Sequence, residues 1–173
     1  MEQKTFEKIK EELLLRAKKA GAYQIGYAMG LRSQSKAAIL KAITDNWFWV
    51  LRTARIVDAE YLEDNFTEEE LTEAGIYTQK YHEVTTTSFA CGSATVEACG
   101  SATVEAYDSA TVKAYDSATV KACGSATVEA YENSYVEDLT GNIRPQSGYA
   151  VIKDYYNHKI YIKKGRYQIV EVD

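Results

Sequence analysis

The sequence has few of the residues and runs that mark particular protein classes. Among its 173 residues there are one proline, two histidines, three cysteines and two tryptophans. No apolar run approaches the roughly 18 residues of a membrane-spanning helix. The charged N-terminus, MEQKTFEKIKEELLLRAKKAG, lacks the apolar stretch and cleavage site of a secretory signal. An odd number of cysteines without such a signal favours free thiols in a reducing compartment, so we expect a cytoplasmic protein.

Motifs of catalytic and cofactor sites are also absent from the sequence. It contains no Gly-rich phosphate loop, no paired-carboxylate motif and no nucleophile elbow. Its two histidines, His82 and His158, belong to no nucleophile or carboxylate pattern. We therefore expect a protein that is not an enzyme and that needs no cofactor.

Charge is distributed unevenly along the chain, although the net charge is only −5. Residues 1–55 contain 11 Lys/Arg and 5 Asp/Glu, residues 56–138 contain 3 and 17, and residues 139–173 contain 6 and 3. The chain is therefore basic, then acidic, then basic again. Such asymmetry indicates a charged partner, or segments that steer each other's docking.

The N-terminal part of the chain has the hydrophobic spacing of helices. Apolar residues recur at intervals of three and four in 5–19 and again in 35–55. Thr67 and Glu70 have the spacing of a capping box, which starts a further helix. These signals predict a small bundle of three to five helices.

Residues 91–138 repeat one octapeptide six times: CGSATVEACGSATVEAYDSATVKAYDSATVKACGSATVEAYENSYVED. Positions 4, 6 and 8 of the octad are apolar and positions 3, 5 and 7 are polar, which is the pattern of a strand with one buried face. Gly or Asp at position 2 of the regular octads supplies a turn. A strand and a turn in every short repeat predict a β-solenoid. The last octad, YENSYVED, departs from the pattern and is expected to mark the change to a cap.

The charged residues at position 7 indicate how many octads make one coil, because equivalent positions of stacked coils lie roughly 4.8 Å apart. One octad per coil would stack like charges, and three would place Glu105 beside Glu129. Two octads per coil give two columns that alternate in sign, Glu97–Lys113–Glu129 and Glu105–Lys121–Glu137. We therefore predict 16 residues per coil and three coils in the regular part.

Together these patterns predict an α+β protein with three parts. A helical domain occupies 1–80, a two-sided parallel β-solenoid of about 16 residues per coil occupies 81–154, and a C-terminal β cap occupies 155–173. The ends of a solenoid are unpaired strand edges, which a protein must cover or charge to avoid association. Self-association through these edges is therefore one interpretation of the solenoid.

The three cysteines share one position of the octad. In a 16-residue coil, Cys91 and Cys123 lie two coils apart, roughly 9–10 Å by the strand spacing, and Cys99 lies at the opposite turn. Zinc ligands must converge within about 2.3 Å of the ion. We therefore interpret the thiols as buried space-filling groups and expect no metal site.

The distribution of charge is the feature of the sequence that bears most directly on function. Cations of the helical segment could form a basic face for nucleic acid or for an acidic protein, or could be solvated and balanced by the acidic middle of the chain. These candidate binding residues are Arg16, Lys18, Lys19, Arg32, Lys36, Lys41, Arg52 and Arg55.

The octad Y-D-S-A-T-V-K-A, with a helical segment before it, resembles the octapeptide-repeat β-solenoid proteins of bacteria, phages and prophage-like elements. The resemblance covers 91–138 and extends loosely to the helices. It implies no catalytic residues. It implies a role in host takeover or defence evasion, including inhibition of a nucleic-acid-guided nuclease, which is an anti-CRISPR activity.

These expectations lead to one principal hypothesis and two alternatives. The principal one is a non-enzymatic protein-binding protein on a rigid solenoid scaffold. In it, the helices or the C-terminal cap recognise a protein partner, such as a component of a host nucleoprotein complex. The alternatives are a nucleic-acid-binding module that uses the basic helical segment, and a structural solenoid that self-assembles.

Overall fold

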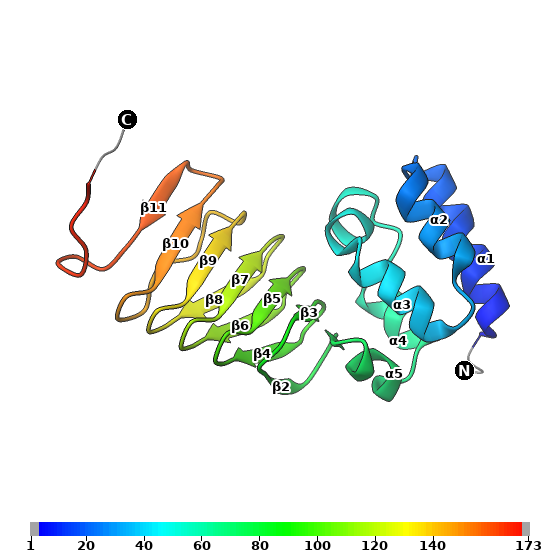
Figure 1. Cartoon of the computed structure of the whole chain (residues 1–173), viewed down its shortest axis with the longest axis horizontal. Helices are drawn as coiled ribbons and strands as arrows, with labels where there is room; N and C mark the ends of the chain where they lie inside the picture. The colour runs from blue at the N-terminus through cyan, green and yellow to red at the C-terminus, as the bar shows by residue number, and fades with distance from the viewer. Residues whose placement is uncertain (1–3, 171–173) are drawn as a thin grey trace. The chain divides into compact units, whose positions relative to one another are not determined.

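The computed structural model describes residues 4–170 and confirms the α+β class. Helices come first, and stacked parallel strands that form a β-solenoid follow (Figure 1). The chain divides into two compact units between Thr78 and Gln79, and each is described here by itself. Within residues 4–170, none of the helices has both the length and the apolar character needed to cross a membrane.

The helical unit consists of short helices joined by tight turns. Its elements are α1 (Phe6–Lys19), α2 (Gln24–Arg32), α3 (Lys36–Thr44), the π-helix η1 (Trp49–Thr53), α4 (Ala59–Asn65), α5 (Glu68–Glu73) and the short strand β1 (Ile76–Tyr77). The predicted capping box is present, because Thr67 Oγ1 accepts the Glu70 amide and Glu70 accepts the Thr67 amide. The unit's largest fully buried side chains include Ile9, Leu40 and Leu62.

The helix predicted for 35–55 is shorter than expected. Ser35 caps its start as the sequence indicates, but α3 ends at Thr44 and the chain turns before η1 begins. At the turn, the Asn46 side-chain amide donates to the carbonyl of Ala42 at 2.8 Å, which replaces a backbone hydrogen bond of a continuing helix. The continuous helix was therefore a wrong prediction, although Trp47 on its apolar stripe is buried.

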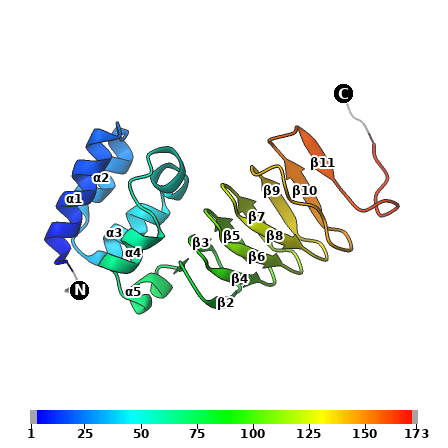
Figure 2. The same cartoon turned by 180° about the vertical axis from the view of Figure 1, so that it is seen from behind.

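The second unit is a solenoid of two parallel sheets (Figures 1 and 2). One sheet contains, in spatial order, β2 (Tyr81–Val84), β4 (Thr95–Ala98), β6 (Thr111–Ala114) and β8 (Thr127–Ala130). Along the other sheet lie β3 (Ser88–Ala90), β5 (Thr103–Ala106), β7 (Thr119–Ala122), β9 (Tyr135–Asp138), β10 (Val151–Asp154) and β11 (Lys159–Tyr161). Consecutive octads lie in different sheets, so alternate octads are neighbours, as predicted.

The register confirms a coil of 16 residues. Lys113 pairs with Glu97 on one side and with Glu129 on the other. In the second sheet the alternation of Glu105, Lys121 and Glu137 continues to Lys153 of β10. The first coil is different, because Glu83 pairs with Glu97 and places two like charges side by side. Valine and alanine of the octads fill the interior, where Val96, Val112 and Ala114 are fully buried.

Position 2 of the octad forms the turn, as predicted. Its backbone is left-handed at Gly100, Asp116 and Glu132, with φ of 64°, 50° and 52°. In this row of turns a carboxylate also binds the turn before it: Asp116 Oδ2 accepts the Gly100 amide at 2.7 Å, and Glu132 Oε2 accepts the Asp116 amide at 2.6 Å. These hydrogen bonds offset the strain of a side chain at positive φ.

The last octad, residues 131–138, still forms a coil. Tyr135 pairs in register with Thr119 and with Val151, so the solenoid continues to β10. The regular pattern stops only after Asp138, whose buried carboxylate replaces the alanine of the other octads and accepts three backbone amides of the irregular segment that follows. Strand β11 then folds back antiparallel on β10, and 165–170 form no strand.

Candidate binding surface

Three of the eight basic residues predicted for the helical face interact within their own unit. Arg16 donates to the Ile56 carbonyl at 2.9 Å, pairs with Glu12 and lies 4.5 Å from the ring centre of Tyr61. Lys36 Nζ lies 3.1 Å from Glu70 Oε2, and Lys41 pairs with Asp45 at 2.8 Å. A pairing of this kind reduces the charge that each cation presents to a partner.

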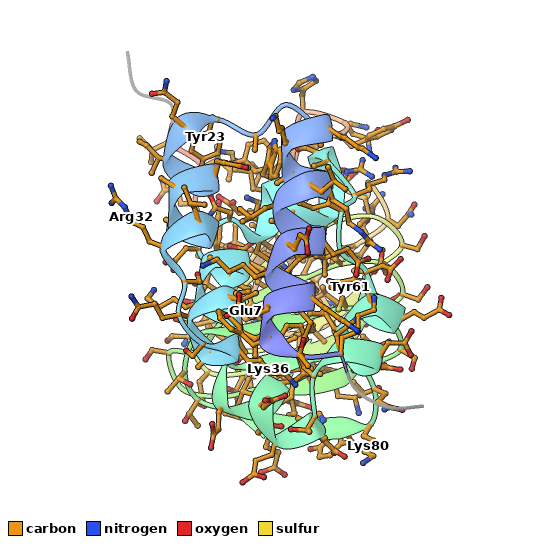
Figure 3. The ribbon with its side chains drawn as sticks, turned by 90° about the vertical axis from the view of Figure 1, so that its right-hand side faces the viewer. Glu7, Tyr23, Arg32, Lys36, Tyr61 and Lys80 are labelled. Atoms are coloured by element: carbon orange, nitrogen blue, oxygen red, sulfur yellow. The ribbon has the colours of Figure 1, made fainter. Side chains whose placement is uncertain are left out.

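The other five predicted cations are exposed but lie on different elements. Lys18 and Lys19 end α1, whereas Arg32 ends α2. Figure 3 shows Arg32 projecting outward from the helical unit. Arg52 lies in η1, and Arg55 follows it with a left-handed backbone, φ 49°. Helix α2 follows α1 after a turn and contains nine residues, with Arg32 at its C-terminal end. Along the axis of α2, Arg32 therefore lies on the order of 12 Å from the N-terminal end of that helix, which adjoins Lys19.

The C-terminal end of the solenoid carries a denser group of cations. From residue 139 to residue 170 the only acidic residue is Asp154, and its side chain is buried. Six basic side chains in the same stretch are all exposed: Arg144, Lys153, Lys159, Lys163, Lys164 and Arg166. The described part of this end therefore has an excess of positive charge, although Glu137 of β9 lies in register with Lys153.

Exposed hydrophobic side chains gather at the same end. From residue 82 to residue 148, all of which the structure describes, no large hydrophobic side chain is exposed. After residue 148, seven are exposed: Tyr149, Tyr155, Tyr156, Ile160, Tyr167, Ile169 and Val170. We call these seven residues and the six cations the C-terminal surface. Its backbone is β10, β11 and the segments before and after them, orange to red in Figure 1.

Cations and aromatic rings of the C-terminal surface hold each other in place. The Arg144 guanidinium lies 4.0 Å from the ring centre of Tyr161, a half-buried residue of β11 that adjoins the surface. Lys153 Nζ lies 4.5 Å from the ring centre of Tyr155, which lowers the freedom of both side chains. Tyr149 and Tyr167 meet edge to face at 5.7 Å, and the Tyr167 hydroxyl donates to the Tyr149 carbonyl. The surface is therefore partly ordered before any partner binds.

Two ionisable groups of this region, Lys153 and Asp154, have shifted pKa values that favour their charged forms. The Tyr155 hydroxyl beside Lys153 raises the pKa of that ammonium group, so it stays protonated. Burial acts to raise the pKa of Asp154, but hydrogen bonds from Asn157 and the backbone outweigh it and lower the pKa. Asp154 is used to fix the β10–β11 turn, since it accepts the Asn157 amide at 2.8 Å.

The remaining candidates offer no comparable site. Cys91 and Cys123 are buried, and burial together with nearby carboxylates raises the pKa of the Cys99 thiol, which disfavours the reactive thiolate. Within residues 4–170, no three His, Cys, Asp or Glu side chains are grouped to hold a metal ion. The helical unit has a small apolar cavity of about 70 Å³ between α1, α2 and α3, with Tyr23 and Trp49 in its wall.

Sequence reasoning placed the candidate cations on the helices, and it named the C-terminal cap as an alternative recognition element without identifying its residues. Two signals were available: residues 139–173 have a basic balance, and departures from the octad consensus accumulate from Glu132 onward. The spatial grouping needed the hairpin, which sets Ile160 opposite Lys153. A comparison with known proteins adds nothing to the assignment, because no family model, curated protein or solved structure matches the chain significantly.

Proposed function

We propose that this chain is a non-enzymatic binding protein in which the solenoid is a rigid platform and the C-terminal surface binds a protein with exposed acidic groups. One observation carries the proposal: exposed large hydrophobic residues are missing from 82 to 148 and concentrated after 148, beside six exposed cations. Contiguous exposed apolar side chains mark interaction sites, since a surface that stays in water gains nothing from them.

The composition of the surface fits a protein partner. Tyrosine and arginine are enriched among the residues that dominate binding energy in protein interfaces, and three exposed aliphatic residues accompany them here. Several of the rings are held by neighbouring cations, so binding would order few additional side chains. The cations favour a partner with carboxylates and accelerate its association.

The solenoid supplies the rigid support for this surface. Successive coils are joined by backbone hydrogen bonds of regular length, such as the Thr111 amide to the Ala94 carbonyl and the Thr127 amide to the Ala110 carbonyl, both 2.9 Å. Fully buried valine and alanine lie between the sheets. Strands β10 and β11 hold Lys153, Lys159 and Ile160 of this surface more precisely than a free loop would.

The most specific form of the proposal comes from the resemblance to octapeptide-repeat proteins of phages and prophage-like elements. In that form the partner belongs to a bacterial defence complex, and the chain inhibits a nucleic-acid-guided nuclease. The acidic partner surface would then be a protein surface of the complex. A capture experiment from cells that contain such a nuclease tests this form together with the general one.

The experiment compares two variants with the same change in net charge. Full-length chain is immobilised and exposed to lysate from bacteria that contain a nucleic-acid-guided nuclease, and bound proteins are identified by mass spectrometry. We expect capture to fall at least tenfold in the triple variant K159E/K163E/K164E and to persist in the control K18E/K19E/R52E. Circular dichroism verifies that both variants are folded.

Loss of capture in the control variant alone would move the binding site to the helical unit and overturn the proposal. That result would favour the alternative in which exposed helical cations such as Lys18, Lys19 and Arg55 bind nucleic acid. A gel shift with an oligonucleotide, repeated at rising salt, separates the two, because binding through phosphates weakens steeply with salt.

A further inference from the structure

The last strand of the solenoid leaves one edge without a neighbour. Within residues 4–170, β11 is the final strand of its sheet and pairs only with β10. At such an edge, every second backbone N–H and C=O points away from the sheet and can pair with another chain. The exposed Ile160, with 66 % of its area accessible, lies in the middle of this edge strand.

From this edge we propose that the partner contributes an extended acidic segment, which adds to the sheet as a strand beside β11. The inference rests on the proposed function and specifies how the C-terminal surface recognises its partner. Strand addition obtains affinity from main-chain hydrogen bonds and specificity from alternate side chains. The alternation on β11 therefore defines the sequence pattern that the added segment must have.

The two faces of β11 differ in chemistry. Ile160 lies opposite Lys153, so its side chain shares a face with that of Lys153, while Lys159 and Tyr161 belong to the other face. Arg144 stacks on Tyr161, so the second face presents two cations, Arg144 and Lys159. A strand beside β11 brings its own side chains within about 4.5–5.5 Å of these residues. An alternating pattern of acidic and apolar residues places carboxylates by the cations and apolar groups by Ile160.

The charge of the edge disfavours a second copy of the chain as its occupant. Edge lysines are a common device against edge-to-edge pairing, and Lys159 lies within β11 while Lys163 and Lys164 follow it. Two copies joined at β11 would bring both sets of lysines together. An acidic strand meets the same lysines as opposite charges, so the residues that prevent self-pairing select for it.

The test measures binding of a labelled peptide to the full-length chain. The probe contains Glu-Val-Glu-Val-Glu-Val between Gly-Ser ends. A first control replaces each valine by proline, which keeps the charge and removes those strand donors, and a second replaces each glutamate by lysine. By fluorescence anisotropy we expect the first control to bind at least tenfold more weakly than the probe and the second to show no binding.

Amide hydrogen exchange of the chain distinguishes strand addition from binding by charge attraction alone, because only strand addition protects the backbone amides of the edge strand. The probe should slow amide exchange at 159–161, whereas the Glu-Pro control should leave it unchanged. In the chain, K159E should weaken binding of the probe at least tenfold. The control K18E, which has the same charge change in the helical unit, should leave the binding unchanged. Light scattering of the free chain should show a monomer.

The possible failures separate the inference from the proposed function. Equal binding of the Glu-Val and Glu-Pro peptides, both lost with K159E/K163E/K164E, would overturn strand addition and leave an acidic protein partner. Absence of binding by the Glu-Val probe together with tight, salt-sensitive binding of an oligonucleotide to the same surface would overturn both. A dimer whose formation protects 159–161 would overturn the choice of occupant.

Discussion

Reversal of the charge at Lys113 should destabilise the solenoid more than its removal. Lys113 has two neighbours in register, Glu97 and Glu129, and it points outward between the buried Val112 and Ala114. Each opposite-charge neighbour is favourable by roughly 0.2–1 kcal/mol, and a like charge is unfavourable by a similar amount. K113E changes both neighbours from attraction to repulsion, so we expect the free energy of unfolding to fall by about 2 kcal/mol, and by about half as much in K113Q.

Urea unfolding at low salt, followed by circular dichroism, measures this free energy. The effect should shrink at 1 M NaCl, where the screening length falls to about 3 Å. The matched control is the inverted column E97K/K113E/E129K, which restores the alternation. It also removes the like-charge contact of Glu83 with residue 97. The inverted column should therefore be more stable than K113E. It should remain somewhat less stable than the native chain, because E97K and E129K remove hydrogen-bond acceptors of the Tyr81 and Tyr131 hydroxyls.

The reasoning would be refuted by a K113E variant as stable as the native chain at low salt. It would equally fail if the inverted column were no more stable than K113E. Either result would mean that the neighbours in register do not interact through their charges.

Two further predictions concern buried polar groups. Ser134 is fully buried, its hydroxyl has no hydrogen-bond partner within residues 4–170, and the regular octads have alanine at this position. The S134A variant should therefore be more stable than the native chain by about 1 kcal/mol in urea unfolding. The exposed control S125A should change the stability little. Burial of the Tyr61 hydroxyl and the nearby Glu12 carboxylate raise the pKa of Tyr61 from 10.0 to about 12, although Arg16 acts in the opposite direction. Because the unfolded chain ionises first, this stability is present below pH 10 and declines as the pH rises towards 12. Y61F should therefore reduce the alkaline loss of helical circular dichroism, and an unchanged loss would contradict the assignment.

Much of the fold followed from local patterns in the sequence. The octad contains both the strand, through its period-two alternation, and the turn, through Gly or Asp at position 2, so a single unit predicts its own backbone. Caps such as Ser35 and the Thr67–Glu70 box are also local, and they occur where predicted. The break after Thr44 was missed because it depends on one side chain, Asn46, which competes for the Ala42 carbonyl.

The candidate site was less predictable than the fold. Arg16 looks like any other cation of an amphipathic helix, yet its guanidinium is directed to a carbonyl 40 residues away, at Ile56. Sequence spacing cannot anticipate such a contact, because it depends on how separate elements pack. The C-terminal surface is formed in the same way, by a hairpin that sets Ile160 beside Lys153 and an arginine that reaches Tyr161.

By itself, the sequence determined the strands, the turns and the 16-residue register, since alternating charges at position 7 favour one stacking over the others. Only the tertiary structure decided which charges remain available to a partner. Helical cations such as Arg16 and Lys36 are paired within their own unit, whereas those from Arg144 to Arg166 stay exposed beside tyrosine and isoleucine. The physical reason is the sequence separation of the interacting residues. In the repeat, each strand is specified by contacts with the coil 16 residues away, whereas the pairing and exposure of the cations depend on residues distant in the chain.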